Sequence, residues 1–264
     1  MKTWTAGKIR AAKGREKLAC LTAYDAITAR LVDEAGLPLI LVGDSLATTS
    51  LGYPTTVFAD MDMMVHHTAA VTRVVRQALV VADMPFMSYQ ISVEVALRNA
   101  SRLLQAGGAD AVKIEGGGER VDVIRALVDN GIPVMAHIGV LPQSVHAAGY
   151  RSRGHDETEA ERLLQDAEAV ATAGAFSVVL ECVKAGVAAE ITKSVSIPTI
   201  GIGSGADCDG QVLVIADLLG LTPEPLPRFV RRFARLDEQA AKALQEYSRA
   251  VAEGTYPAVE HTYP

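Results

Sequence analysis

The chain has 264 residues, of which 49% are hydrophobic, 21% are charged and 5% are aromatic, and its formal net charge is −6. This composition excludes an intrinsically disordered chain, and the 31 acidic against 25 basic residues argue against a nucleic-acid partner. Three cysteines exclude a disulfide scaffold and indicate a reducing cytoplasm, and we expect neither an export signal nor a membrane span, because no apolar run approaches about 18 residues.

Short, continuous apolar runs recur along the chain. Runs of this kind predict parallel strands that are covered on both faces. Seven strands are expected at 18–21, 38–42, 79–82, 111–114, 133–136, 176–180 and 198–202, with 211–216 as an eighth candidate.

Amphipathic stretches between the strands predict helices, most of which end close to a glycine or before a proline. The expected helices cover 26–34, 93–105, 121–129, 156–172 and 185–194. The tail, 228–253, begins with several arginines and predicts one or two amphipathic helices, packed on the body or on a neighbouring subunit.

The alternation of strand and helix is that of repeated βαβ units. It fits either an open doubly wound sheet or a closed (β/α)₈ barrel. Residues 21–25, which follow the first strand, contain no glycine and therefore lack the usual dinucleotide fingerprint. We predict a single α/β domain over residues 1–264, a (β/α)₈ TIM-type barrel with extra C-terminal helices.

Five of the predicted strands end in an acidic or histidine side chain: Asp44, Asp83, Glu115, His137 and Glu181. The carboxyl ends of the strands of a barrel meet at one mouth, where the active sites of this fold lie. An acidic residue after a strand is also a common turn residue or helix N-cap. Because five strands share the feature, we favour a polar site at the mouth.

The run from Ala111 to Glu115 is the most informative of the five. Side chains alternate along a strand, so Val112 and Ile114 share one face, and Lys113 and Glu115 share the other with Ala111. The aliphatic pair suits the helix-covered face, which directs both charges into the barrel. Buried charges need partners, so the sequence predicts either a Lys113–Glu115 ion pair or a negatively charged cup that holds a cation.

The ligand types indicate which cation would bind. Carboxylates without nearby cysteine or histidine partners favour hard ions such as Mg²⁺. Cys20, Cys182 and Cys208 lie too far apart in sequence for a zinc site. The adjacent His66 and His67 point to different faces of a helix and are interpreted as ordinary helix residues.

A magnesium ion held by Asp44 and Asp83 would chelate a 2-oxo acid and make the adjacent C–H bond more acidic. Glu181 follows an apolar strand across the mouth and is the candidate base, while Lys113 would neutralise charge that develops on oxygen. The residues alone therefore predict a metal-assisted enzyme that forms an enolate, without indicating the electrophile.

A glycine-rich loop, 201–205, follows the seventh strand. Many barrels bind phosphate at this place, but glycines also simply permit tight turns. Asp207 and Asp209 are expected to shape this loop or to cap the next helix.

The chain resembles the ketopantoate hydroxymethyltransferase family over nearly its whole length. The resembling segments include LILVGDSL, LVVADMPFMSYQ, GADAVKIEGG, GIPVMAHIG with PQSVH, GAFSVVLECV and SIPTIGIGSGADCDGQVLV. The resemblance implies a (β/α)₈ barrel assembled as a homodecamer. It also implies transfer of a hydroxymethyl group from 5,10-methylenetetrahydrofolate to 3-methyl-2-oxobutanoate, which gives 2-dehydropantoate for pantothenate synthesis.

Carried over position by position, the resemblance also assigns roles to residues. Mg²⁺ would be bound by Asp44, Asp83 and Glu115. The oxo acid would be contacted by Ser45 and Lys113 alongside both aspartates, and Glu181 would be the proton acceptor. The role of Ser45 is implied by the resemblance alone.

The chain departs from the usual family pattern at 56–60, at three positions within 136–141 and at 149–155. We place these departures on loops that touch the folate or close the mouth.

Two other functions fit a barrel with such a site. One is a lyase or phosphonomutase of the phosphoenolpyruvate/pyruvate group, although the cysteine-containing loop typical of that group is missing; the other is a non-enzymatic barrel that binds a keto acid.

Overall fold

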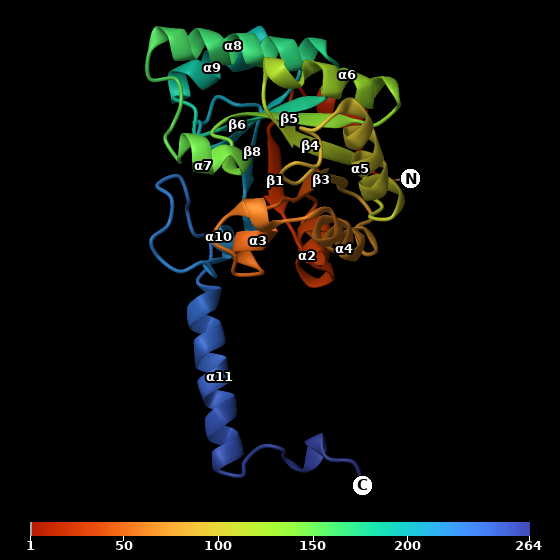
Figure 1. Cartoon of the computed structure of the whole chain (residues 1–264). Coiled ribbons are helices and arrows are strands. Elements are labelled where there is room, and N and C mark those ends of the chain that lie inside the picture. Colours follow the sequence, from red (N-terminus) through yellow and green to blue (C-terminus); the bar gives the residue numbers. More distant parts are fainter. Residues whose placement is uncertain (1) are drawn as a thin grey trace. The chain divides into compact units, whose positions relative to one another are not determined.

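The computed structural model describes residues 2–264, which form two compact units, the first reaching to Ile215 and the second being Ala216–Pro264. In the first unit, eight parallel strands pair in sequence order and close into a barrel (Figure 1). The strands are β1 (Leu18–Thr22), β2 (Leu39–Val42), β3 (Leu79–Asp83), β4 (Ala111–Glu115), β5 (Val134–Gly139), β6 (Ser177–Glu181), β7 (Thr199–Ile202) and β8 (Gly210–Leu213). The predicted (β/α)₈ barrel is confirmed.

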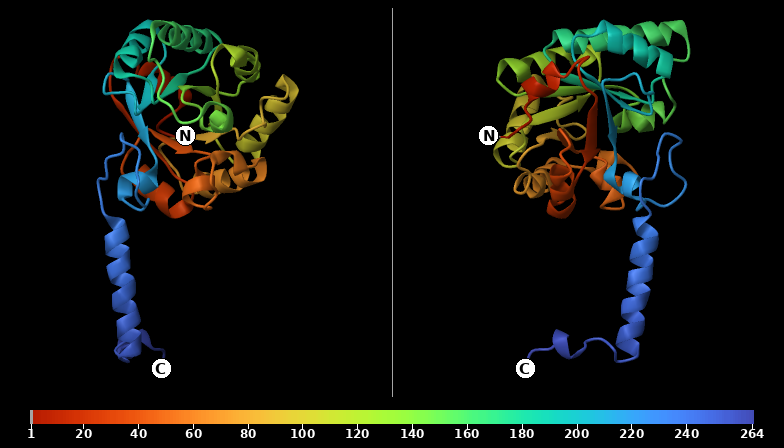
Figure 2. Two further views of the ribbon diagram at one scale, coloured as in Figure 1. Left: turned by 60° about the vertical axis from the view of Figure 1, so that its left-hand side comes forward. Right: turned by 180° about the vertical axis from the view of Figure 1, so that it is seen from behind.

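Helices surround the strands, as the two further views show (Figure 2). They are α1 (Ala6–Ala11), α2 (Ala26–Glu34), α3 (Leu46–Thr49), α4 (Met61–Thr72), α5 (Val93–Gln105), α6 (Val121–Asp129), α7 (Val145–Ala148), α8 (Glu157–Thr172) and α9 (Ala185–Ser194). A further helix, α10 (Ile215–Leu219), begins at the last residue of the first unit and belongs otherwise to the second. Short 3₁₀ turns are η1 (Thr56–Phe58), η2 (Gly118–Arg120) and η3 (Pro142–Ser144). Four predicted helices have the expected bounds, and α8 begins one residue later because the Asp156 side chain caps it by accepting from the Glu159 N–H.

Several strands are longer at their carboxyl ends than the apolar runs predicted. Asp83, Glu115 and Glu181 are the last residues of their strands, and His137 lies inside β5. The ladder continues through these polar residues because backbone hydrogen bonding does not depend on the side chain, and Glu115 still pairs with His137. The predicted eighth strand is too long, since β8 ends at Leu213 before α10 begins. Ala136, which the sequence analysis placed on a loop, is instead buried within β5.

Aliphatic side chains fill the barrel below the polar mouth. The cluster includes Leu39 and Leu41 of β2, Val81 of β3 and Met135 of β5. Ile9 of α1 belongs to the same cluster, so the N-terminal helix closes this core. Each large aliphatic side chain buried here contributes about 1.5–3 kcal/mol to folding, which makes the barrel interior a packed core rather than a channel.

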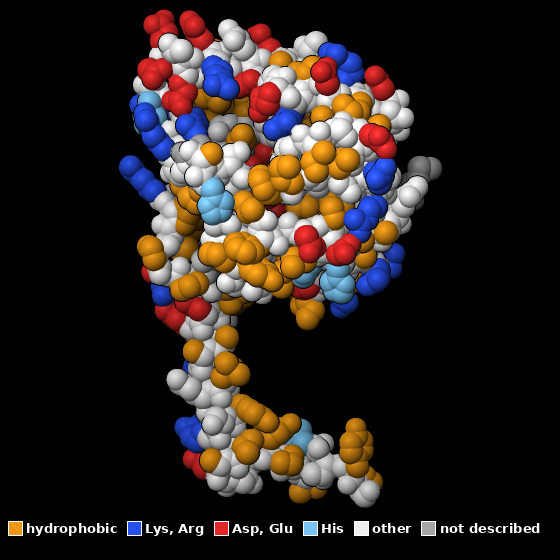
Figure 3. Space-filling view, in the orientation of Figure 1, with side chains coloured by type: hydrophobic (Ala, Val, Ile, Leu, Met, Phe, Trp, Pro, Cys, Tyr) orange, Lys and Arg blue, Asp and Glu red, His pale blue; other side chains and the backbone are white. Residues whose placement is uncertain are grey.

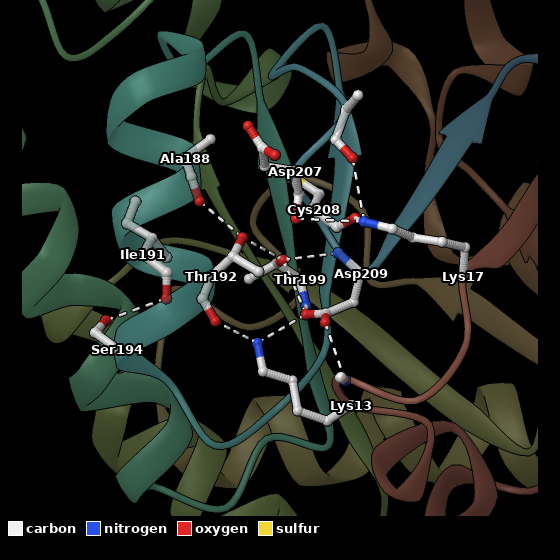
Figure 4. Close-up of polar contacts among 12 residues, drawn as sticks. Lys13, Lys17, Ala188, Ile191, Thr192, Ser194, Thr199, Asp207, Cys208 and Asp209 are labelled. Carbon is white, nitrogen blue, oxygen red and sulfur yellow. Dashed lines mark hydrogen bonds and ion pairs between the residues drawn. The ribbon is translucent and has the colours of Figure 1, made fainter.

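A polar network joins the amino ends of β7 and β8 to the N-terminal segment (Figure 4). Asp209 accepts hydrogen bonds from the Thr199 N–H at 2.9 Å and from Lys13 Nζ at 2.7 Å. Lys13 Nζ also donates to the Thr192 carbonyl at 2.5 Å. Burial raises the pKa of Asp209, but its hydrogen bonds and the Lys13 charge lower it by more, so the pKa lies below its usual range. Asp209 therefore shapes the β7–β8 connection, as predicted, and it does not cap a helix.

Besides most of α10, the second unit contains α11 (Leu236–Ala252) and η4 (Val259–His261). The sequence predicted the helical part of the tail from residue 228, but α11 begins only at Leu236. The acidic residues Asp237 and Glu238 occupy the first turn of α11, and both lie close to Arg235. No residue of α11 is buried within the chain. None of the helices formed by residues 2–264 is both long enough and apolar enough to cross a bilayer.

Candidate active site

Five neighbouring strands deliver polar side chains to one end of the barrel. Asp44 follows β2, and the others come from β3 to β6: Asp83, Lys113, Glu115, His137 and Glu181. All except Glu181 are at most 4% exposed, and the Glu181 side chain is 18% exposed. The strand register places Asp83 beside Lys113 and Glu115 beside His137. The structure therefore brings the predicted catalytic and metal residues together at the mouth.

Lys113 forms its ion pair with Asp83 and not with Glu115. Its Nζ atom lies 3.0 Å from Asp83 Oδ1 and 3.2 Å from His137 Nδ1. Of the two alternatives for these charges, the Lys113–Glu115 pair does not form, because Lys113 reaches the neighbouring strand, where the parallel register places Asp83 directly opposite. Burial lowers the pKa of Lys113, but the charges of Asp83, Glu115 and Asp44 raise it above its usual value. Lys113 therefore remains an ammonium ion.

Three buried acids share this single lysine. Burial, followed by the charge of Asp83, raises the pKa of Asp44 to about 7, although Lys113 and Gln143 oppose the rise. Burial and the charge of Asp44 raise the pKa of Glu115 well above its usual value. Since every carboxylate here makes ionisation of the others more costly, the cluster favours an additional positive charge.

The buried oxygens of the cluster also suit a cation. Asp83 Oδ1, which faces Lys113, and Glu115 Oε1 accept no hydrogen bond of good geometry. Carboxylate oxygens of this kind are the donors that Mg²⁺ prefers. Across residues 2–264, no three histidine, cysteine or acidic side chains already stand together as a ready-made metal cage. The residues thus have the right chemistry for Mg²⁺, and its binding stays a prediction.

His137 connects the lysine to the candidate base. A lysine ammonium only donates hydrogen bonds, so His137 Nδ1, 3.2 Å away, must act as the acceptor. This assigns the ring proton to Nε2, which lies 3.3 Å from Glu181 Oε2. Burial and the Lys113 charge lower the pKa of His137. A neutral imidazole therefore separates Lys113 from Glu181.

Ser45 lies at the rim, directly after Asp44. Its hydroxyl is 2.8 Å from the Tyr24 hydroxyl, and the preceding Asp44 N–H donates to Asp83 Oδ2 at 3.1 Å. A side chain at Gly43 would meet Ser45 Oγ at 2.8 Å, so glycine here lets the Ser45 hydroxyl keep its place over the strand end. Ser45 is thus held close to both aspartates, where the family resemblance places a substrate contact.

Gln143 and Tyr89 also belong to the site, although sequence reasoning did not identify them. The Gln143 side chain donates to Asp44 Oδ2 at 2.9 Å, and the Tyr89 hydroxyl donates to Gln143 Oε1 at 2.8 Å. Both side chains are buried. Neither carries a charge or follows a strand directly; the available signals were the LVVADMPFMSYQ and PQSVH segments, which contain Tyr89 and Gln143 and carry the family resemblance.

The glycine-rich loop after β7 supports the end of β6. The Ser204 hydroxyl donates to the Leu180 carbonyl at 2.7 Å and accepts from the Val183 N–H at 3.0 Å. These bonds flank Glu181, the last residue of β6, so one role of the loop is to hold the candidate base in place. Gly203 and Gly205 adopt positive φ angles that suit glycine. The loop thus fits the interpretation in which its glycines permit a tight turn.

Apolar side chains are exposed on the segments that follow β2 and β3. Tyr53 and Phe58 stack with their ring centroids 5.2 Å apart, and Phe86 and Met87 are 40% and 46% exposed. In the space-filling view, hydrophobic side chains gather over the part of the barrel near α3 and α7 (Figure 3).

His66 and His67 lie in helix α4, as the sequence indicated. The Nδ1 atom of His67 lies 2.7 Å from the Tyr24 carbonyl oxygen.

Comparisons with known proteins agree on one family. The sequence profile of a family described as ketopantoate hydroxymethyltransferase matches residues 3–259. The 3-methyl-2-oxobutanoate hydroxymethyltransferase of Clostridium novyi (strain NT) is 52% identical to this chain, over 96% of this chain and 93% of the relative. The enzyme of the same name from Carboxydothermus hydrogenoformans is 53% identical, over 94% of this chain and 90% of the relative.

Solved structures with a similar fold are much more distant in sequence. Oxaloacetate acetylhydrolase has a TM-score of 0.63 at 16% identity, over 100% of this chain and 93% of that chain. Phosphonopyruvate hydrolase has a TM-score of 0.63 at 15% identity, over 100% of this chain and 92% of that chain. At this identity the likeness concerns the barrel fold alone and does not extend to the reaction.

Proposed function

Because the chain belongs to the ketopantoate hydroxymethyltransferase family and is therefore a transferase, we propose that it moves a hydroxymethyl group from 5,10-methylenetetrahydrofolate to 3-methyl-2-oxobutanoate, forming 2-dehydropantoate for pantothenate synthesis. One observation carries the proposal: a continuous chain of contacts, from Asp83 through Lys113 and His137 to Glu181, links the proposed oxo-acid site to the proposed base. Each link is between 3.0 and 3.3 Å.

Asp44, Asp83 and Glu115 would hold Mg²⁺, for which their carboxylate oxygens are suitable donors. When bound, the ion would supply Lewis acidity at the keto oxygen of the substrate, and this makes the C3 proton easier to remove. The unbalanced negative charge of the three acids supports this assignment.

Glu181 would accept the C3 proton of the oxo acid. Its carboxylate is the least buried acid of the site, with 18% of the side chain exposed, so it can reach a substrate that enters through the mouth. His137 Nε2 lies 3.3 Å from Glu181 Oε2 and would orient this carboxylate. The Lys113 ammonium would balance the negative charge that develops on the substrate oxygen once the proton has left.

Water would add to the methylene carbon of the folate donor, both of its C–N bonds would break with the two water protons passing to the nitrogens, and tetrahydrofolate would be released. The nucleophilic C3 carbon would then bond to the resulting one-carbon unit, which is at the oxidation level of formaldehyde, and its oxygen would take the proton held by Glu181 to become the new hydroxyl group. Ser45, held by Tyr24 beside the aspartates, would orient the oxo acid. The exposed Tyr53–Phe58 pair supplies flat apolar surface near this entrance.

The test is proton exchange at C3 of 3-methyl-2-oxobutanoate in D₂O, followed by NMR with and without Mg²⁺ and with and without the folate donor. We expect exchange that requires Mg²⁺ but not folate, and formation of 2-dehydropantoate only when the donor is added. The absence of exchange in the presence of Mg²⁺ would refute the proposed proton transfer. Cleavage of a carbon–carbon bond without folate would favour a lyase instead.

We also propose that the chain assembles into a homo-oligomer, which the family resemblance implies to be a homodecamer. The exposed apolar residues of α11 support self-association: Leu244 is 68% exposed, Tyr247 59% and Val251 48%. Light scattering should give a mass ten times that of the 27.9 kDa chain. A monomer at micromolar concentration would contradict this proposal.

A further inference from the structure

Gln143 occupies a central position among the loops of the mouth. It lies in η3, which follows β5, and it is only 4% exposed. Its Nε2 atom donates to Asp44 Oδ2 and to the Met84 carbonyl, both at 2.9 Å. Its Oε1 atom accepts from the Tyr89 hydroxyl at 2.8 Å and from Gln90 Nε2 at 3.2 Å. Both donors and both lone pairs of the amide are therefore in use.

These partners also determine which way the amide faces. The Met84 carbonyl can only accept, so the NH₂ group must face it, and the Gln90 NH₂ group requires the oxygen on the other side. A flipped amide would lose these bonds. Since Met84 contributes a backbone atom, one anchor of the Gln143 side chain is part of the barrel framework itself.

The backbone of Gln143 holds a second acid. Its N–H donates to Glu115 Oε2 at 3.0 Å. One residue therefore binds Asp44, which follows β2, and Glu115, the last residue of β4. It occupies Asp44 Oδ2 and Glu115 Oε2, whereas Glu115 Oε1 accepts no hydrogen bond of good geometry and Asp83 Oδ1 faces Lys113 Nζ at 3.0 Å. Gln143 thus leaves Glu115 Oε1 free of hydrogen bonds, and this oxygen is available to an ion.

We propose that Gln143 is a positioning residue that orients Asp44 and Glu115 in advance for a divalent cation. The inference rests on the proposed function for the identity of that cation, Mg²⁺. Mg²⁺ requires near-ideal octahedral geometry, so its affinity depends on carboxylates that are ordered before it binds. A neutral amide suits this role because it donates directed hydrogen bonds without adding a positive charge that would repel the ion.

The test measures Mg²⁺ binding by titration calorimetry on the full chain without substrate. In Gln143→Leu the four side-chain hydrogen bonds are lost and the backbone bond to Glu115 remains. We expect the Kd for Mg²⁺ to rise roughly 10- to 100-fold, the usual effect of removing a group that orients a metal ligand. The Kd for Ca²⁺, which tolerates irregular geometry, should rise less. A purely structural role would not change the ratio of the two affinities.

Gln105→Leu is the matched control, because Gln105 is exposed at the end of α5. Its Mg²⁺ affinity should equal that of the unmodified chain. Circular dichroism and the Tm verify folding, and if Gln143→Leu does not fold, Gln143→Asn decides, since it keeps an amide that is too short to reach its partners.

The outcomes separate this inference from the proposed function. An Mg²⁺ affinity within twofold of the unmodified chain in a folded Gln143 variant overturns the positioning role alone. Mg²⁺ binding by the unmodified chain without C3 exchange overturns the proposed reaction, and the Gln143 variants still decide the inference. An unmodified chain that binds no Mg²⁺ overturns both.

Discussion

Replacing Asp44 by asparagine should stabilise the protein in the absence of metal, even though it removes a carboxylate that we propose as a ligand of Mg²⁺. Asp44 is buried near Asp83, and its pKa is raised from an ordinary value of 3.8 to about 7. In the unfolded chain the carboxyl ionises near pH 4, whereas in the folded protein it retains its proton until about pH 7. The folded state therefore binds more protons over this interval, and the free energy of unfolding falls as the pH rises through it.

The magnitude follows from the difference in pKa. One pKa unit corresponds to about 1.4 kcal/mol, so the change from 3.8 to about 7 corresponds to a loss of about 4 kcal/mol between pH 4 and pH 7. Asparagine does not ionise, and its side-chain oxygen can still accept the hydrogen bond from Gln143 Nε2. Asp44→Asn should thus match the unmodified chain at pH 4 and exceed it by up to about 4 kcal/mol at pH 8.

The assay is urea unfolding from pH 4 to pH 8 in the presence of EDTA, at one fixed protein concentration. Adding Mg²⁺ at 100 times its Kd should then stabilise the unmodified chain by about 2.7 kcal/mol at pH 8 and the variant far less. A difference in stability between the two proteins that does not vary with pH would refute the reasoning, because it would mean that Asp44 is not held protonated by its surroundings.

Three further predictions concern the base and two structural carboxylates. Glu181→Gln should slow C3 exchange by roughly 10²- to 10⁴-fold and leave the Mg²⁺ affinity within twofold; unchanged exchange would exclude Glu181 as the base. Asp33 accepts backbone N–H groups from three consecutive residues, 76–78; burial raises the pKa of Asp33, but these bonds lower it below its usual value. Its ionised form therefore stabilises the fold above pH 4 and loses this effect as the pH falls through the folded pKa. In urea unfolding, Asp33→Asn should lower the free energy of unfolding by about 1–3 kcal/mol at pH 7 and by progressively less as the pH is lowered below 4. Lys13→Met should lower the free energy of unfolding by about 3 kcal/mol at pH 7, because it leaves the buried Asp209 without its ion pair. Arg98→Met, which removes an exposed ion pair with Glu94, should change this free energy by less than about 0.5 kcal/mol. Equal effects of the two substitutions would contradict the assigned burial.

The barrel was predictable because its signals are local. Continuous apolar runs separated by amphipathic segments identified all eight strands, and the bounds of α2, α5, α6 and α9 agree with the structure. The ends of the strands were not predictable from hydrophobicity, since the ladder extends into polar residues such as Glu181. The start of α11 was also missed, because the arginines before Leu236 have high helix propensity but do not continue the helix.

The site was only partly predictable. The residues at the strand ends came together as expected, because parallel strands present their carboxyl ends on one side. The partner of Lys113 was not settled by the sequence, since alternation along β4 specifies a face and leaves the neighbouring strand open. Gln143 was missed for a related reason: its five hydrogen bonds reach residues up to 99 positions away, and no periodicity in the sequence reports such contacts.

By itself, the sequence determined the alternation of strands and helices, the inward face of Lys113 and Glu115, and the chemical character of the mouth. Each of these follows from neighbours within a few positions along the chain. Only the tertiary structure decided that Lys113 pairs with Asp83, that His137 stands between Lys113 and Glu181, and that Gln143 joins Asp44 to Glu115. These contacts depend on the register between strands and on the path of the returning loops, and both are fixed only when the barrel closes.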